Sequence, residues 1–187
     1  GDAARPASFE DAGLKFSDSA DGAALERNQR QFLAALWARG YPAARMVARR
    51  AHAQFENGTA EAVYTFESGP QARFNGVEIE GEIRTEPDFL TKLRTWEDGE
   101  IYDREKLVAY RDRLSKTGIF TTIEVSPGAI RDDGLAPVKL TLAERKRRTV
   151  GAGVSYSTSE GPGGRLFLEY RNFFGRGERA RAEIEGT

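Results

Sequence analysis

Hydrophobic and polar residues alternate in three successive stretches at the C-terminal end of the chain. Val150, Val154 and Tyr156 share one side of the first stretch, while glycine and serine dominate the other side. The alternation returns around Leu166 and again around Ile184, where charged residues fill the opposite side. A period of two residues is typical of a β-strand, whose side chains point alternately to the two faces of a sheet. The pattern therefore predicts three meandering strands with one apolar and one polar face.

Such a sheet is typical of a membrane β-barrel, in which the apolar face meets lipid and the polar face lines the lumen. The two tyrosines of the apolar set suit the aromatic girdle of a barrel. Three strands cannot close a barrel, so we expect the lipid-embedded part to be incomplete in this chain. A soluble sheet with one solvent-exposed face is the alternative interpretation. The predicted lipid-facing residues are Val150, Val154, Tyr156, Leu166, Leu168, Tyr170 and Ile184.

An internal repeat organises the rest of the chain. A shift of 78 positions aligns Phe32 with Tyr110 and Gly40 with Gly118, together with the strand patterns that follow them. One offset thus aligns a helix face, a helix stop and a strand face, which indicates two units of the same fold. The first unit is predicted to be truncated and the second complete. The predicted domains are residues 1–70, 71–146 and 147–187.

The second unit is predicted to have the order strand, helix, helix, strand, strand. Its first strand ends at Gly81, and Thr85 has the spacing of a capping-box N-cap for a short helix. Asp103 is predicted to cap a longer helix that ends at Gly118. A hairpin over residues 120–142 follows, with a polar turn between its strands. This order predicts an α+β fold.

The first unit is predicted to lack its first strand. A helix is expected near residues 22–39, and residues 8–16 are interpreted as the remnant of an earlier helix. A hairpin follows, in which Asn57-Gly58 suits a two-residue turn. The pairs predicted from this turn are Phe55 with Ala60, Ala53 with Ala62 and Ala51 with Tyr64.

Several short motifs resemble those of outer-membrane protein assembly factors. Residues 99–102 resemble the G-x-x-Y motif of a POTRA unit, and residues 117–125 resemble its glycine-aromatic strand. Residues 151–164 resemble the first barrel strand and turn, and residues 170–178 resemble the second strand with its N-x-F-G-R-G loop. Over roughly residues 10–187 the chain is similar to the BamA/TamA-type family, and most similar to its TamA branch. The resemblance implies tandem POTRA units, each a three-stranded sheet with two helices on one face, before a truncated outer-membrane barrel.

The resemblance also implies a location in the outer membrane, with the POTRA units in the periplasm. It implies a role in receiving unfolded β-rich clients and aiding their insertion or translocation. An extended client can add to an open sheet edge through backbone hydrogen bonds. The implied partners are unfolded outer-membrane proteins or autotransporters, a TamB-like inner-membrane protein, and outer-membrane lipid. The predicted client-binding edge residues are Arg45, Val47, Arg49, Ala51, Phe120, Thr121, Ile123 and Val125.

Composition argues against several other functions. The chain has 28 Lys and Arg and 29 Asp and Glu, and this near-zero balance does not point to nucleic acid. There is no cysteine, and His52 is the single histidine, so no thiolate, Ser–His pair or histidine-rich metal cluster can be assembled. We therefore expect no enzymatic activity, cofactor or metal. The sequence also shows no apolar run of transmembrane-helix length and no signal segment at its N-terminus.

Other function classes stay open from the sequence alone. A two-partner-secretion-type pore, which exports one dedicated client, also carries POTRA units before a barrel. A soluble α+β interaction module unrelated to membranes is the second alternative. A carboxylate-based hydrolase is the third, because acidic residues are plentiful.

Overall fold

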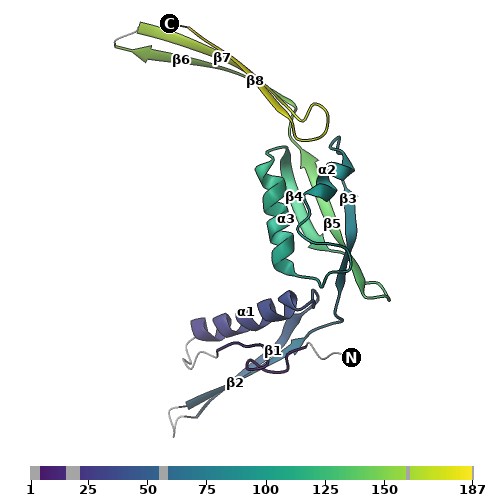
Figure 1. Cartoon of the computed structure of the whole chain (residues 1–187). Coiled ribbons are helices and arrows are strands. Elements are labelled where there is room, and N and C mark those ends of the chain that lie inside the picture. The colour runs from purple at the N-terminus through teal and green to yellow at the C-terminus, as the bar shows by residue number, and fades with distance from the viewer. Residues whose placement is uncertain (1–4, 16–21, 55–58, 159–160, 187) are drawn as a thin grey trace. The chain divides into compact units, whose positions relative to one another are not determined.

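The computed structural model describes residues 5–15, 22–54, 59–158 and 161–186 (Figure 1). Within these ranges the chain forms three helices and three small sheets. The chain divides into two compact units, each built from separate segments. The first unit comprises Gly1–Gly76, Trp96–Val108 and Pro127–Val138, and the second comprises Val77–Thr95, Ala109–Ser126 and Lys139–Thr187.

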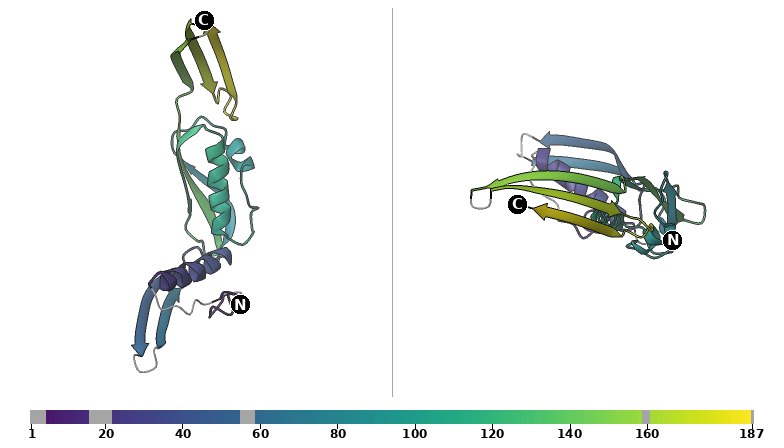
Figure 2. Two further views of the ribbon diagram at one scale, coloured as in Figure 1. Left: turned by 90° about the vertical axis from the view of Figure 1, so that its left-hand side faces the viewer. Right: turned by 90° about the horizontal axis from the view of Figure 1, so that it is seen from above.

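A helix and a two-stranded ribbon form the N-terminal part of the first unit. The helix is α1 (Gly22–Ala38), and it lies along one face of the ribbon formed by β1 (Arg45–Gln54) and β2 (Thr59–Glu67) (Figure 2). Phe32 and Leu36 of α1 are buried, as helical spacing requires of a core-facing stripe. The predicted helix near residues 22–39 is therefore confirmed.

The expected helical remnant at residues 8–16 is wrong for its described part, since residues 7–13 form bends and turns. Phe9 and Ala12 nevertheless join the core, and the Phe9 ring lies 5.0 Å from the Phe32 ring. Their spacing therefore reflects two core contacts made by a turn. Over so few residues, such contacts cannot be told apart from the period of a helix.

The β1–β2 ladder differs in register from the prediction. Ala51 lies opposite Ala62, whereas Tyr64 was the predicted partner, so the predicted register was wrong by two residues. Among the described residues the ladder ends with the pair of Gln54 and Thr59.

The predicted Asn57-Gly58 turn itself lies outside the described residues. A register shift of two residues keeps every side chain on the same face of the ribbon. Tyr64 and Phe66 accordingly remain half-buried, whereas Val63 is 49% exposed.

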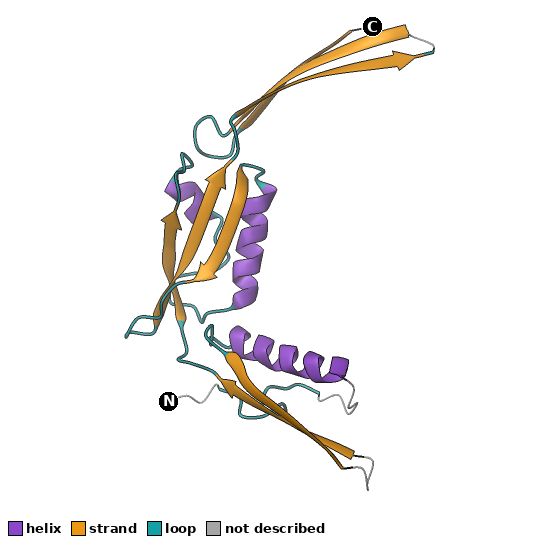
Figure 3. Cartoon of the chain, turned by 180° about the vertical axis from the view of Figure 1, so that it is seen from behind, coloured by secondary structure: helices purple, strands orange, loops and turns teal. Residues whose placement is uncertain are grey.

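The middle of the chain has the predicted order strand, helix, helix, strand, strand. Its sheet has the strand order β3-β5-β4, and both helices lie on one face of it (Figure 3). The α+β fold class is therefore confirmed. The elements are β3 (Arg73–Glu80), α2 (Pro87–Lys92), α3 (Arg104–Lys116), β4 (Phe120–Pro127) and β5 (Leu135–Glu144).

Aromatic packing and a helix cap hold this region. Phe74 of β3 stacks on Trp96 and Tyr102, with ring centroids 4.7 and 4.8 Å away, and all three are buried. At the start of α3, Asp103 Oδ1 accepts the N–H of Glu105 at 2.9 Å, which confirms the predicted cap. None of the helices in the described part of the chain is long and apolar enough to span a membrane.

The C-terminal sheet belongs to the second unit and is a three-stranded meander of order β6-β7-β8. The three predicted strands are thus present, each long and antiparallel to the next. Their bounds are β6 (Arg148–Ser157), β7 (Gly161–Arg171) and β8 (Arg179–Gly186).

Candidate functional site

One face of the β6–β8 sheet is a continuous apolar surface. Val150 lies opposite Leu168, and Leu166 lies opposite Ile184, so the predicted residues form cross-strand rows on a single face. Val154 is 96% exposed and Ile184 is 76% exposed. Of the seven predicted lipid-facing residues, Val150, Val154, Tyr156, Leu166, Leu168 and Ile184 are exposed and Tyr170 is half-buried. An apolar surface of this kind calls for an apolar environment.

The opposite face of the same sheet is charged and organised around Glu169. The Glu169 side chain is 9% exposed and accepts a 3.0 Å hydrogen bond from Arg171 Nε. Arg179 lies 3.2 Å from the same carboxylate, and the Arg181 guanidinium lies over the Phe167 ring. One face of the sheet is therefore apolar and the other charged, as expected for a lipid-facing and a lumen-facing side.

The β4 strand forms an open edge of the middle sheet. The order β3-β5-β4 gives β4 only one strand neighbour among the described residues. The Arg145 N–H donates to the Ile119 carbonyl at 2.7 Å, which shows that the backbone of Ile119 points toward β5. Backbone groups of an antiparallel strand alternate in direction, so those of Thr122 and Glu124 point to the open edge. These N–H and C=O groups are available to an incoming strand.

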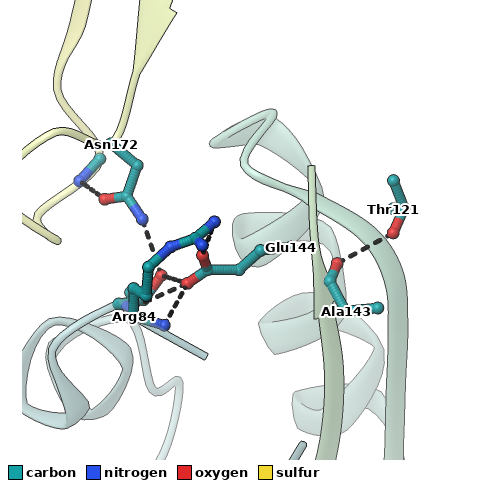
Figure 4. A network of polar contacts seen from close by, with 7 residues as sticks. Arg84, Thr121, Ala143, Glu144 and Asn172 are labelled. Carbon is teal, nitrogen blue, oxygen red and sulfur yellow. Dashed lines mark hydrogen bonds and ion pairs between the residues drawn. The ribbon is translucent and has the colours of Figure 1, made fainter. Parts of the chain in front are cut away.

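The predicted β4 residues differ in whether their side chains and backbone groups are free to contact a client. Phe120 has its side chain in the core, and its carbonyl accepts a 2.9 Å hydrogen bond from Arg145 Nε. The Thr121 hydroxyl donates to the Ala143 carbonyl at 3.0 Å (Figure 4). The same alternation directs the backbone of Ile123 and Val125 toward β5. The sequence prediction therefore identified the strand but missed the outward backbone groups of the intervening residues.

The β1 strand is a less regular edge. Its register shifts between Met46 and Ala48, so Val47 forms a bulge. Arg45 pairs with Glu67 of β2 at 2.6 Å, and Arg49 lies opposite Tyr64. Bulges and charged side chains are features that protect an edge from strand addition. The predicted β1 residues, including Ala51 opposite Ala62, are thus on a strand less suited to pairing than β4.

A buried polar network joins the start of α2 to the loop between β7 and β8. The helix begins at Pro87, and no side chain caps it, so the predicted capping role of Thr85 is wrong. Thr85 Oγ1 instead donates to Glu144 at 2.7 Å and accepts a 2.9 Å hydrogen bond from Asn172 Nδ2. The Thr85 hydroxyl is therefore already engaged by groups 59 and 87 residues away in the chain.

Glu144 is the acceptor at the centre of this network (Figure 4). Its side chain is 5% exposed, and it accepts the N–H groups of Arg84 and Thr85, both at 2.8 Å. The Arg84 guanidinium lies 3.2 Å from its second oxygen. Burial raises the pKa of Glu144, but the three donors and the Arg84 charge together outweigh it, so that its pKa is lowered.

The pH dependence of stability follows from this lowered pKa. A carboxyl group with a lower pKa in the folded state stabilises the fold at pH values above its unfolded pKa, and this stabilisation is lost as pH falls through the folded pKa. We expect Glu144→Gln to lose less stability than the original chain between neutral and acidic pH. Urea unfolding at a series of pH values measures this, and parallel pH profiles for the two proteins would contradict it.

The β7–β8 loop is fixed to the start of α2 by further contacts. The Glu86 N–H donates to the Gly175 carbonyl at 3.0 Å, and Arg176 pairs with the Glu86 carboxylate at 2.9 Å. Within the loop, Asn172 Oδ1 accepts the Gly177 N–H at 3.0 Å. The segment that resembles the N-x-F-G-R-G loop thus attaches the C-terminal strands to the start of α2. Among the described residues no group of three His, Asp or Glu is placed to hold a metal ion.

The fold and these edges define a POTRA domain placed before barrel-type strands. Residues 72–145 match the POTRA family, described as "Surface antigen variable number repeat". The outer-membrane protein assembly factor BamA of Nitratidesulfovibrio vulgaris is 23% identical over 122 residues, which are 65% of this chain and 15% of that protein. Residues 72–145 therefore form a POTRA-type domain, and the chain is similar to an outer-membrane protein assembly factor over about two thirds of its length.

Solved structures show the same fold. BamA from Haemophilus ducreyi lacking POTRA domains 1–3 matches with a TM-score of 0.78 and 19% identity, over 92% of this chain and 32% of that one. CdiB from Acinetobacter baumannii matches with a TM-score of 0.52 and 14% identity, over 88% of this chain and 30% of that one. The chain thus spans about a third of these structures and less of the curated relative.

Proposed function

We propose that this chain is the membrane-adjacent part of an assembly factor that receives unfolded β-rich proteins on the open edge of β4. The observation that carries the proposal is the pair of outward backbone groups at Thr122 and Glu124, on a strand with one neighbour. Backbone pairing selects extended chains with little regard to side-chain sequence. That property suits a factor that handles many clients and performs no chemistry on them.

Proline at Thr122 tests the edge. Thr122→Pro removes one outward donor while leaving the β4–β5 ladder intact, because proline is tolerated at an edge position whose N–H faces solvent. We expect a synthetic strand peptide of alternating aromatic and polar residues to bind about 3- to 10-fold more weakly. This change corresponds to the loss of one backbone hydrogen bond, together with the steric effect of the proline ring on the approach of the peptide. Fluorescence anisotropy with a labelled peptide measures the affinity.

Thr122→Ala is the matched control, because it changes the same side chain and keeps the N–H. Its affinity should stay at the original value, and both variants should retain the original circular dichroism spectrum. Equal affinity of the proline and alanine variants, with both folded, would reject strand addition at β4.

A secretion pore for one dedicated client is the second candidate function, and the likeness to CdiB favours it at the level of the fold. The two candidates differ in selectivity. Comparable binding of strand peptides from unrelated outer-membrane proteins supports the assembly factor, whereas strong preference for one client supports the pore.

The TamA-like specialisation is a finer part of this proposal. It would make autotransporters the main clients and a TamB-like inner-membrane protein the partner, and it rests on the sequence motifs at residues 99–102 and 170–178. Co-purification of the full-length protein with an inner-membrane partner from the native envelope tests it directly.

A further inference from the structure

Four consecutive basic residues connect β5 to β6: Arg145, Lys146, Arg147 and Arg148. Within the described part of the chain, none of them forms an ion pair with a carboxylate. Arg147 Nε is buried and has no hydrogen-bond partner in that part of the chain. Uncompensated positive charge of this density in a short connection calls for an anionic ligand.

Neighbouring arginines of the same unit are compensated. Arg84 pairs with Glu144, Arg176 pairs with Glu86, and Arg171 and Arg179 both pair with Glu169. Each of these four arginines has a carboxylate partner, whereas residues 145–148 have none among the described residues. Positive charge without a carboxylate partner is therefore concentrated in the connection.

The basic run ends at the margin of the apolar face. Arg148 is the first residue of β6 and shares its exposed face with Val150, two residues further on. Arg148 lies opposite Tyr170, and its guanidinium is 5.2 Å from the centre of the Tyr170 ring. A cation over an aromatic ring at the end of an apolar stripe is an arrangement suited to the boundary between hydrocarbon and headgroups.

Aromatic side chains extend this boundary. The Phe173 ring lies 5.9 Å from the Tyr170 ring and 4.7 Å from the Phe174 ring, and Phe174 is 71% exposed. The exposed Tyr156 lies on the same face of β6, eight residues from Arg148. That separation is about 27 Å along an extended strand, which suits an apolar band about 25 Å tall once the strand is tilted.

We propose that residues 145–148 form a binding site for the phosphate groups of anionic phospholipids, in the leaflet that faces the POTRA domain. This inference rests on the proposed function and takes the apolar face of β6–β8 to lie in the membrane. The arginines can donate two parallel hydrogen bonds to a phosphate, and Lys146 adds a mobile point charge. The half-buried Phe173 and the exposed Phe174 would lie at the same level and hold the sheet there.

Vesicle partitioning of the whole 187-residue chain tests the site. The original chain should bind vesicles of phosphatidylcholine with phosphatidylglycerol more tightly than vesicles of phosphatidylcholine alone, and added salt should weaken the preference. The double variant Lys146→Gln/Arg148→Gln should bind the phosphatidylglycerol vesicles roughly 10- to 30-fold more weakly, since each basic residue near an anionic surface contributes about 1 kcal/mol. Its binding to phosphatidylcholine vesicles should stay unchanged.

Arg111→Gln/Lys116→Gln is the matched control, because it removes the same charge from the exposed surface of α3. This control should keep most of the preference for phosphatidylglycerol. Equal binding of the original chain to both vesicle types, or an equal loss in the control, would overturn the phospholipid site and leave the membrane placement standing. Failure to bind either vesicle type would overturn the membrane placement itself.

Discussion

Glu144→Ala is expected to lower the free energy of unfolding of the second unit by about 2 to 4 kcal/mol, because it leaves several buried donors without an acceptor. The donors are the backbone N–H groups of Arg84 and Thr85 and the Thr85 hydroxyl. Asn172 also loses its alignment, since its amide donates to Thr85. Urea unfolding followed by circular dichroism measures the change.

Glu80→Ala provides the control for this variant. Glu80 is an exposed carboxylate of the same unit, 4.0 Å from Lys139, and its loss should change stability by less than about 0.5 kcal/mol. Proteolysis adds a second measurement: loss of Glu144 should expose the β7–β8 loop to cleavage, whereas loss of Glu80 should not. Similar stability and similar cleavage in the two variants would show that the network contributes little.

Gly81→Ala is expected to be more damaging, at about 3 to 5 kcal/mol, because strain and overpacking act together. Gly81 has φ +117°, and a Cβ there would lie 2.4 Å from the Leu142 carbonyl oxygen. That oxygen is backbone of a central strand, so it cannot move aside without disturbing the β3–β5 ladder. Thermal unfolding of the variant measures the cost.

Gly76→Ala separates the two causes of this cost. Gly76 also has a positive φ, +65°, but nothing lies within 4 Å of a Cβ built there. Its replacement should cost only about 1 to 2 kcal/mol, the strain of a left-handed conformation. If the two alanine variants were equally stable, contact with Leu142 would be unimportant at Gly81.

Local patterns in the sequence were sufficient for the order of elements and for the two faces of the C-terminal sheet. The alternation around Val150 and Leu166 predicts one apolar face, and the structure places these residues in adjacent cross-strand rows. Asp103 was identified as a cap because its partner, the N–H of Glu105, is only two residues away. Interactions of this kind are encoded within a few residues and can be inferred without the fold.

Other features depend on residues far apart in the chain and could not be predicted from local patterns. Thr85 has the spacing of a cap, yet Glu144 and Asn172 take its hydroxyl in the folded protein. The direction of the Thr122 backbone is set by the bond between Arg145 and Ile119, which no motif reveals. The hairpin register was predicted wrongly for a related reason: a local turn signal does not fix the register when packing against α1 decides which side chains meet.

The connection between β5 and β6 has a consequence for how an incoming protein could travel. Arg148 lies three residues beyond Arg145, which is bonded to Ile119, and Thr122 lies three residues beyond Ile119. Fully extended, these two spans together reach about 20 Å, which is shorter than one membrane-crossing strand of about nine to eleven residues. A single strand could therefore keep its first residues paired with β4 while its last residues enter the bilayer. Its unpaired backbone groups would then not have to cross open water between the two.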